Sequence, residues 1–404
     1  MEQITTPAGQ VSRLLEQLTE SATLAMARLS RELSQQGLDI VNLSLGEPDF
    51  DTPDFAKNAA KKAIDDNITH YPPVNGFLDV RKAIATKFKR DNGLDYAPDQ
   101  IVVSTGAKQS IANAVLALVN PGDEVIMPSP FWVSYSEIVK IAGGVPVKVH
   151  AGLDQDFKIT PKQLKDAITP KTKLIIYSSP CNPSGSVFSA EELRAMAEII
   201  TEHEHIYVIS DEIYEFINYS GKNVSIATLP GMYERTITVN GVSKAFAMTG
   251  WRIGFIGAPK WIAEACTKMQ GQITSGTSTI SQMAAKAAME ADPSEVNYMI
   301  DTFRVRRDLM YSLLQEIPGL KINLPEGAFY FFPEVSAYLG KSYQGEVIRS
   351  AADLCMYMLE HFHVATVSGE AFGDDKCIRL SYATSEEGIR KACARIKNAL
   401  AALS

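Results

Sequence analysis

Lys244 has a setting in the sequence that could give its side-chain amine a chemical role. Two segments apolar enough to be buried strands, residues 236–239 and 252–256, enclose a turn of small residues that contains this lysine. Between such strands the amine would be desolvated and its pKa lowered, and an uncharged amine can form a Schiff base with a carbonyl compound. The alternative is a solvated lysine in an ordinary loop. Taken alone, so short a motif favours the loop lysine over the Schiff-base lysine. Other residues are needed to choose between the two interpretations.

A second stretch, residues 104–110, has the composition of an anion-binding loop. It follows the apolar run 101–103 and opens a helix with small residues, among them Gly106 and Ala107. Backbone N–H groups and the positive end of a helix can hold a phosphate in such a place. The spacing is not that of a nucleotide P-loop, and no Gly-x-Gly-x-x-Gly opens a helix, which disfavours ATPase and dehydrogenase functions. The alternative is an ordinary strand–helix junction with a capping residue.

Three further polar side chains are candidates for ligand binding; two of them are expected at or after the end of a strand and one within a strand. Asn182 lies between two prolines after the strand 174–177, in a loop that is also consistent with a plain turn. Asp211 closes an apolar strand; it could cap a helix, or hold a pyridine nitrogen protonated so that the ring accepts electrons. Arg379 lies in a β-type run, where it could bind a carboxylate through two hydrogen bonds or form a surface ion pair.

The elements that must position these residues follow an alternating pattern. Short apolar strands alternate with helices from residue 101 to residue 256, which predicts βαβ units and a mostly parallel sheet covered on both faces. Ligands of such sheets bind outside the carboxyl ends of the strands. The expected strands are 101–103, 124–127, 145–149, 174–177, 206–209, 236–239 and 253–256, and the helices between them are 107–118, 132–142, 161–167 and 190–202.

The flanking regions are predicted to be more helical. Helices are expected at 11–36 with a break near 21–23, and at 55–65, 78–90, 261–269, 278–290, 293–316, 351–361 and 386–402, with short strands near 40–45, 320–324 and 328–332. We therefore expect a large domain at 52–291, and a small α+β domain made from both chain ends, residues 1–51 and 292–404.

Composition excludes several classes of function. The chain has 404 residues, 46% of them hydrophobic and 21% charged, and a net charge of -8, which disfavours a sequence-independent grip on nucleic acid. No apolar run of about 18 residues predicts a membrane span, and the N-terminus has no apolar signal core. The five cysteines and six histidines follow no metal-binding spacing. A cytoplasmic protein with free thiols and no metal is expected.

Taken together, the motifs resemble the aspartate aminotransferases, which are class I, pyridoxal-phosphate-dependent (PLP) aminotransferases of fold type I. The resemblance runs from Ser21 to the C-terminus. It implies a large PLP-binding domain with a seven-stranded sheet, a small second domain, and the Schiff-base role for Lys244. The motifs that carry it, in order, are Gly46-Glu47-Pro48, Thr105-Gly106-Ala107-Lys108, Asn182-Pro183-Ser184-Gly185, Asp211-Glu212-Ile213-Tyr214, and Ser243-Lys244 followed by Arg252, together with Arg379.

The resemblance also implies a role for each matched position. Lys244 would bind PLP covalently and then move a proton in a ping-pong transfer, while Asp211 and Tyr214 would complete the catalytic set. The cofactor would also contact Gly106, Ala107, Lys108, Trp132, Asn182, Ser243 and Arg252, and Tyr71 would reach the phosphate in the partner subunit of a homodimer. The substrate would contact Gly46, Lys108, Trp132, Asn182, Ser21, Thr23 and Arg379, which would clamp its α-carboxylate.

The N-terminal stretch 21–25 looks like the bacterial and archaeal branch of the family, in which this segment folds over the substrate. A lysine at the position of Lys108 is associated there with the distal carboxylate of aspartate or glutamate, although a solvent-exposed lysine is the alternative. The implied function is amino transfer between aspartate, or a similar dicarboxylic amino acid, and 2-oxoglutarate.

Two other functions stay open at this point. The first is an aminotransferase for prephenate, aromatic or alanine-type substrates, or a C–S β-lyase with the same core residues. The second is a non-catalytic module of a transcription regulator, which is disfavoured because too little sequence precedes Ser21 for a DNA-binding domain and the pI is about 5.4.

Overall fold

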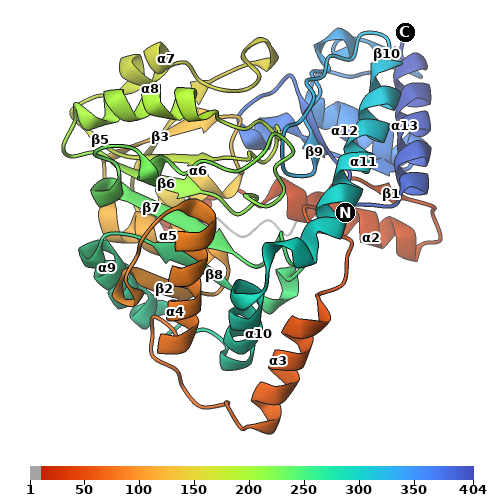
Figure 1. Ribbon diagram of the computed structural model, residues 1–404. Helices are drawn as coiled ribbons and strands as arrows, with labels where there is room; N and C mark the ends of the chain where they lie inside the picture. Colours follow the sequence, from red (N-terminus) through yellow and green to blue (C-terminus); the bar gives the residue numbers. More distant parts are fainter. Residues whose placement is uncertain (1–10) are drawn as a thin grey trace.

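The computed structural model describes residues 11–404, and a seven-stranded sheet, called the central sheet below, forms the middle layer of the part at the left in Figure 1. The strand order is β2-β8-β7-β6-β5-β3-β4, and all neighbours are parallel except β8, which is antiparallel to β2 and β7. This confirms the predicted α/β class. The strands are β2 (Ile101–Ser104), β3 (Glu124–Ser129), β4 (Val145–His150), β5 (Thr172–Ser178), β6 (Tyr207–Asp211), β7 (Thr236–Gly241) and β8 (Gly254–Gly257).

Helices cover both faces of this sheet because its central strands are apolar on both sides. Val102 packs with the helices of one face, whereas Ile101 and Val103 pack with those of the other. The first face is covered by α5 (Ala107–Leu118), α6 (Ser134–Ile141) and α9 (Lys260–Ile273). The second is covered by α3 (Asp54–Asp65), α4 (Leu78–Lys87), α7 (Pro161–Ala167), α8 (Ala190–Thr201) and α10 (Thr279–Glu290).

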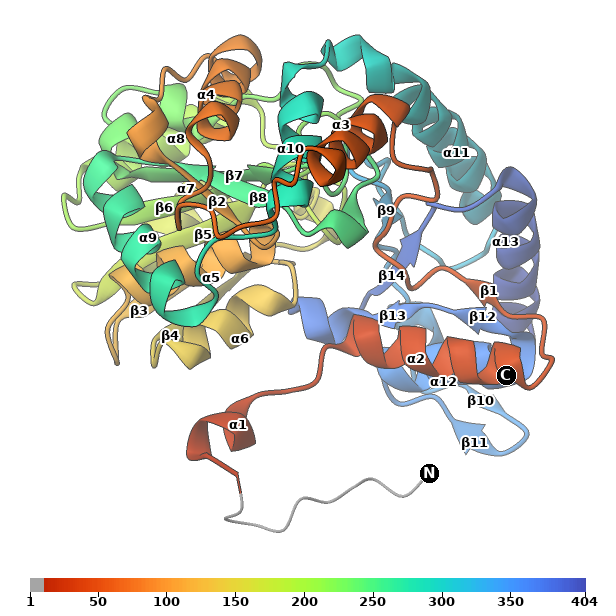
Figure 2. The ribbon, with the colours of Figure 1, turned by 90° about the horizontal axis from the view of Figure 1, so that it is seen from below.

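A second region joins the two ends of the chain. The parallel pair β1 (Val41–Asn42) and β12 (Val364–Ala365) brings them together, and α2 (Ala22–Gln35) lies against β12 and β13 (Figure 2). Its other elements are α11 (Asn297–Gln315), α12 (Ala351–Phe362), α13 (Glu386–Ala401), the antiparallel sheet of β13 (Val367–Ser368), β14 (Ile378–Ser381) and β9 (Tyr330–Phe331), and the hairpin of β10 (Ser342–Tyr343) and β11 (Glu346–Val347). Helix α1 (Arg13–Gln17) instead contacts α6. The predicted domain boundaries stay a prediction.

Two predicted elements differ in the structure. Residues 320–324 do not form a strand; only Lys321 bridges to Glu334. Pro325 and Pro333 flank that bridge and have no N–H to extend the ladder. The predicted helix 78–90 is α-helical only to Lys87 and then widens into a π-turn over Phe88–Asn92.

The fold brings the predicted motifs to one edge of the central sheet. Strands β2, β5, β6 and β7 are parallel to one another, so their carboxyl ends share this edge, and the loops that follow them carry the motifs singled out above. Among residues 11–404, no helix is long and apolar enough to cross a membrane.

Gly254 allows the closest approach in this part of the fold. A Cβ added there would overlap the backbone of Gly106 and Ala107, at the start of α5. We expect Gly254→Ala to lower the free energy of unfolding by about 1–3 kcal/mol, as overpacking does, when measured by urea denaturation. Gly250→Ala is the control, because a Cβ there has no neighbour within 4 Å. Equal effects of the two substitutions would contradict this account of α5 docking.

Candidate active site

A cavity of about 360 Å³ lies at the carboxyl edge of the central sheet, against the second region. The structure brings nearly all predicted site residues to it. Those that line the cavity are Ser21, Thr23, Gly46, Ala107, Lys108, Trp132, Asn182, Asp211, Tyr214, Ser243, Lys244, Arg252 and Arg379. Their roles toward a ligand stay predictions, but their convergence from distant positions of the chain is a finding.

Lys244 follows β7 and sends its amine into this cavity. Its Nζ donates a hydrogen bond to the Gly46 carbonyl, which belongs to the chain's N-terminal part. Burial, followed by the positive charge of Arg379, lowers the pKa of Lys244 to about 8. The amine loses its proton more readily near neutral pH than an ordinary lysine does, as a nucleophilic amine requires.

Asp211 ends β6 and is buried beside the cavity. Its Oδ2 accepts a 2.6 Å hydrogen bond from the Tyr135 hydroxyl, and its Oδ1 accepts one of 3.3 Å from the Ile213 amide. Burial raises the pKa of Asp211 to about 6 despite these bonds. No cation pairs with this carboxylate among residues 11–404, so it can receive a positively charged group of a ligand.

Tyr135 is a residue that the sequence argument missed. It lies on α6, three positions after Trp132, and is completely buried. That spacing places the two side chains on one side of the chain, and their rings meet edge to face with centroids 5.5 Å apart. The signal in the sequence was a tyrosine three residues after a predicted site residue. Nothing in the sequence indicated that its hydroxyl would contact Asp211.

The start of α5 and Arg252 together form a site for an anion. Gly106 is the N-cap of α5 with a φ of +82°, and a Cβ there would overlap the Arg252 guanidinium. Arg252 adopts a φ of +57° and donates a 2.9 Å hydrogen bond to the Thr249 carbonyl. The free N–H groups of the helix start and the guanidinium thus lie together, as phosphate binding requires. Gly106 does not line the cavity itself.

Arg379 supplies a second cationic site from β14. Its side chain is 1% exposed, and it donates to the Asn182 side-chain oxygen at 3.0 Å and to the Ser44 carbonyl at 2.6 Å. Its Nε is buried without a hydrogen-bond partner, and no carboxylate pairs with it among the described residues. Burial lowers its pKa. An unpaired buried guanidinium points to a carboxylate ligand.

Tyr330 is the other residue that the sequence argument did not single out. Its ring lies under the Arg379 guanidinium at 4.6 Å, and its hydroxyl is 2.8 Å from that of Tyr214. It therefore connects Tyr214, which is predicted to belong to the catalytic set, with Arg379, which is predicted to bind a carboxylate. Tyr330 belongs to β9, and the pairing of β9 with β14, in which Ser381 lies opposite Tyr330, brings it close to Arg379. The sequence did not predict this pairing.

Lys108 lines the cavity and is itself exposed to solvent. Its Nζ is 5.0 Å from the centroid of the Trp132 ring, and burial, followed by the positive charge of Arg252, lowers its pKa. Ser21 and Thr23, at the start of α2, line the same cavity. Lys108 is thus both exposed to solvent and part of the cavity wall, and its role toward a substrate stays a prediction.

Tyr71 lies outside this cavity and is 96% exposed. Its predicted contact is with a partner subunit, so the prediction is not tested by a single chain. No group of three or more His, Cys, Asp and Glu side chains in the part of the chain that the structure describes is arranged to hold a metal ion.

Known proteins are similar to this chain over most of its length. A family model for "Aminotransferase class I and II" matches residues 38–396. A Petunia hybrida protein, described as a bifunctional aspartate aminotransferase and glutamate/aspartate-prephenate aminotransferase, is 48% identical over 385 residues, 94% of this chain and 80% of its own length.

Two solved structures are also similar. The aspartate aminotransferase of Rhizobium meliloti is 42% identical, with a TM-score of 0.94 over 98% of this chain and 100% of its own. The aspartate aminotransferase of Thermus thermophilus, solved with maleate, is 41% identical, with a TM-score of 0.91 over 96% of this chain and 99% of its own.

The lowered pKa of Lys244 makes a prediction about stability. Between about pH 8 and its usual pKa of 10.5, the unfolded chain binds the lysine proton more tightly than the folded chain does. Folding is therefore penalised at neutral pH, and the penalty declines as the pH rises through this window. We expect Lys244→Met to raise the free energy of unfolding by roughly 1–3 kcal/mol at pH 7, with a smaller gain at pH 10.

The measurement is urea unfolding at pH 7, 8.5 and 10, on protein freed of small-molecule ligands. The matched control is Lys61→Met, which removes an exposed lysine from α3. A gain for Lys244→Met that did not shrink toward pH 10 would contradict a desolvated amine at this position.

Proposed function

The chain belongs to the class I and II aminotransferases, and from this premise we propose that it binds PLP and transfers the amino group of a dicarboxylic amino acid, aspartate or glutamate, to a 2-oxo acid such as 2-oxoglutarate. One observation carries the proposal. The cavity joins an amine of lowered pKa, Lys244, a buried carboxylate without a cation, Asp211, and a buried guanidinium without a carboxylate, Arg379.

The residues of the cavity fit PLP. The start of α5, Ser243 and Arg252 would hold the phosphate, and Asp211 would keep a proton on the ring nitrogen. Asn182 and Tyr214 would lie beside the ring oxygen, and Trp132 beside the ring face. When bound, PLP supplies a carbonyl carbon for amine attachment and a ring that accepts electrons.

The chain's own residues would then act on the substrate. Arg379 would fix its α-carboxylate, with the Asn182 amide oxygen and the Ser44 carbonyl holding the guanidinium in place. Lys244, once the substrate has replaced it on the cofactor, would remove the proton from the substrate Cα and deliver it to the cofactor carbon that carries the amino group. Tyr214 would be held by the Tyr330 hydroxyl.

Lys108 supports a substrate with a second carboxylate. It is the cation of the cavity wall next to Trp132, and it forms no ion pair with another described residue. The Thermus thermophilus relative was solved with maleate, which is a dicarboxylate. Prephenate is a second candidate substrate, supported by the description of the Petunia hybrida relative and by the aromatic face of Trp132.

We also propose a homodimer and a cytoplasmic location. Tyr71 is almost fully exposed in the single chain, as expected for a side chain that completes the site of a partner subunit. The five cysteines are free and buried, which suits a reducing compartment.

The experiment for the proposed function is a half-reaction assay with bound PLP. We expect aspartate and glutamate to convert the visible absorbance band of the enzyme, and alanine and phenylalanine to do so much more slowly. Lys244→Ala should abolish the band that reports covalent attachment. If neither dicarboxylic amino acid changes the spectrum, the substrate class is wrong, and an unchanged band in Lys244→Ala means that another residue holds the cofactor.

The role of Lys108 has a separate test. Lys108→Ala should lower kcat/KM for aspartate and glutamate about 10- to 100-fold, the effect of losing one charge-assisted hydrogen bond, chiefly through KM. Activity with alanine should change little. Lys173→Ala is the matched control, because Lys173 lies 5.0 Å from the Tyr207 ring, the same distance as Lys108 from Trp132, but outside the cavity. An equal loss for alanine and aspartate would assign Lys108 to the phosphate or to folding.

A further inference from the structure

The turn after β6 presents side chains to two opposite sides. Asp211 and Tyr214 line the cavity, whereas Glu212 and Glu215 point away from it toward the end of α4. The backbone of the turn is closed by hydrogen bonds from the Glu212 amide to the Val239 carbonyl and from the Glu215 amide to the Glu212 carbonyl, both 2.9 Å. Whatever fixes the two glutamates therefore also fixes the two cavity residues.

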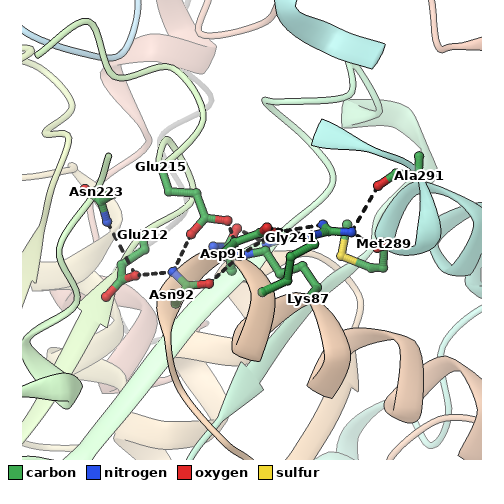
Figure 3. A network of polar contacts seen from close by, with 11 residues as sticks. Lys87, Asp91, Asn92, Glu212, Glu215, Asn223, Gly241, Met289 and Ala291 are labelled. Carbon is green, nitrogen blue, oxygen red and sulfur yellow. Dashed lines mark hydrogen bonds and ion pairs between the residues drawn. The ribbon is translucent and has the colours of Figure 1, made fainter. Parts of the chain in front are cut away.

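A single asparagine holds both glutamates from behind (Figure 3). The Asn92 side-chain amide donates to Glu212 Oε2 at 3.1 Å and to Glu215 Oε2 at 2.6 Å. Its oxygen accepts a 2.7 Å hydrogen bond from Lys87 Nζ. Asn92 reaches this place because α4 continues into the π-turn Phe88–Asn92, and such turns occur frequently at functional sites.

The charges of this cluster do not balance. Lys87 is 1% exposed and forms an ion pair with Glu215, which is also buried. Glu212 is fully buried and has no cation within ion-pair distance among the described residues; its contacts are the neutral side chains of Asn92, Ser210 and Asn223. A buried carboxylate without a cation is costly, so Glu212 is more stable with a proton.

The groups that face Glu212 come from several elements. Asp91 is bound chiefly by Arg90, which donates to both of its oxygens at 2.6 and 2.9 Å and also to the Met289 and Ala291 carbonyls. Its Oδ2 also lies 3.9 Å from Lys87 Nζ. The other titratable groups around Glu212 are Lys87, Glu215, Tyr96 and Tyr177. Burial, followed by the charge of Glu215, raises the pKa of Glu212 to about 7.

The contact with Ser210 is consistent with a neutral acid. The Ser210 hydroxyl lies 2.9 Å from Glu212 Oε1 and 2.9 Å from the Tyr177 hydroxyl, but it has only one hydrogen. A protonated Glu212 can donate to Ser210, which then donates to Tyr177; because Tyr177 also has a hydrogen, an ionised Glu212 is satisfied equally when Tyr177 donates to Ser210 and Ser210 donates to Glu212.

We propose that Lys87, Asn92, Glu212 and Glu215 form a positioning cluster that holds the Asp211–Tyr214 turn against the cavity, with Glu215 as the ionised partner of Lys87 and Glu212 as a neutral hydrogen-bonded acid. The proposal rests on the proposed function in that Asp211 and Tyr214 serve PLP. None of the four cluster residues lines the cavity, so they act through the turn and not on the substrate.

The test compares two isosteric substitutions, Glu212→Gln and Glu215→Gln, in the full chain. Glu215→Gln removes the nearest counter-ion of buried Lys87 and leaves only Asp91, whose Oδ2 is 3.9 Å away and is shared with Arg90, so we expect Tm to fall by roughly 5 °C or more. The PLP dissociation constant should rise about tenfold or more, because the turn loses its support. Glu212→Gln keeps the hydrogen bonds of a neutral acid, and we expect Tm at pH 5.5 to stay within about 2 °C of the parent and PLP affinity within about twofold.

The pH dependence separates the neutral acid from a merely structural glutamate. With a raised pKa in the folded chain, Glu212 binds its proton more tightly than the unfolded chain does, so parent stability declines as the pH rises from about 4.5 to about 7. Glu212→Gln removes this decline. Its Tm relative to the parent should therefore increase between pH 5.5 and pH 8, in protein freed of PLP.

Two further variants complete the experiment. Lys87→Met combined with Glu215→Gln restores the charge balance and should recover part of the lost Tm, and it replaces Glu215→Gln in every measurement if that variant does not fold. Leu354→Ala removes a buried side chain of α12; at a comparable loss of Tm it should leave PLP affinity unchanged.

Three results would overturn the proposal. The first is an equal loss of Tm for Glu212→Gln and Glu215→Gln. The second is a loss of PLP affinity in Leu354→Ala as large as that in a cluster variant with the same loss of Tm. The third is an effect of Glu212→Gln on Tm that does not vary with pH. If the parent itself binds no PLP, the proposed function fails, while the comparison of Tm values still decides the charge states of the cluster.

Discussion

Three ionic groups at the carboxyl edge of the central sheet, two of them buried and one half-buried, need partners that the described chain does not supply. Asp211, Lys244 and Arg379 all border one cavity, and none of them forms an ion pair with another described residue. Removing a charge from water costs several kcal/mol when no partner replaces the solvent. The surrounding hydrogen bonds fix these groups in direction without neutralising them, and a ligand with complementary charges would supply the missing partners. Binding would thus be coupled to stability.

The turn after β6 places two buried acids, Asp211 and Glu212, in different surroundings. Asp211 faces the cavity and awaits a cationic group, while Glu212, the next residue, faces a closed cluster with its own amide donors. Neighbouring residues of a strand end point to opposite sides, so two acids with raised pKa can be adjacent in sequence without sharing an environment. The cluster around Glu212 holds the turn in place, so Asp211 can remain without a cationic partner until a ligand binds.

Much of the fold was accessible from the sequence because its signals are local. Apolar runs alternating with amphipathic helices predicted the seven-stranded sheet, and α5 (Ala107–Leu118) and α7 (Pro161–Ala167) match their predicted ranges. The cavity residues Ala107, Asn182, Asp211 and Lys244 were singled out because each lies at or just after the end of a predicted strand. The resemblance to the family, and not a local signal, indicated Trp132, Ser21 and Thr23. The strand expected at 320–324 was wrong because apolar composition does not reveal how far pairing extends between prolines.

The residues that were missed depend on contacts between distant segments. Tyr135, Tyr330 and Asn92 lie in no recognised motif, and each acts through a partner that is remote in the chain. The π-turn that directs Asn92 inward has no sequence signature of its own. Pairwise geometry of this kind becomes visible only when the elements are assembled.

Arg379 shows how strictly that assembly is specified. Strand β14 pairs with β9 so that Leu380 lies opposite Phe331 and Ser381 opposite Tyr330, and with β13 so that Arg379 lies opposite Val367. A shift of one residue in this register would turn Arg379 to the other face of the small sheet and remove both its Asn182 and Ser44 contacts. The apolar neighbours in β14, Ile378 and Leu380, are buried in the core of the second region, so the same hydrophobic packing that stabilises this region also directs the guanidinium into the cavity.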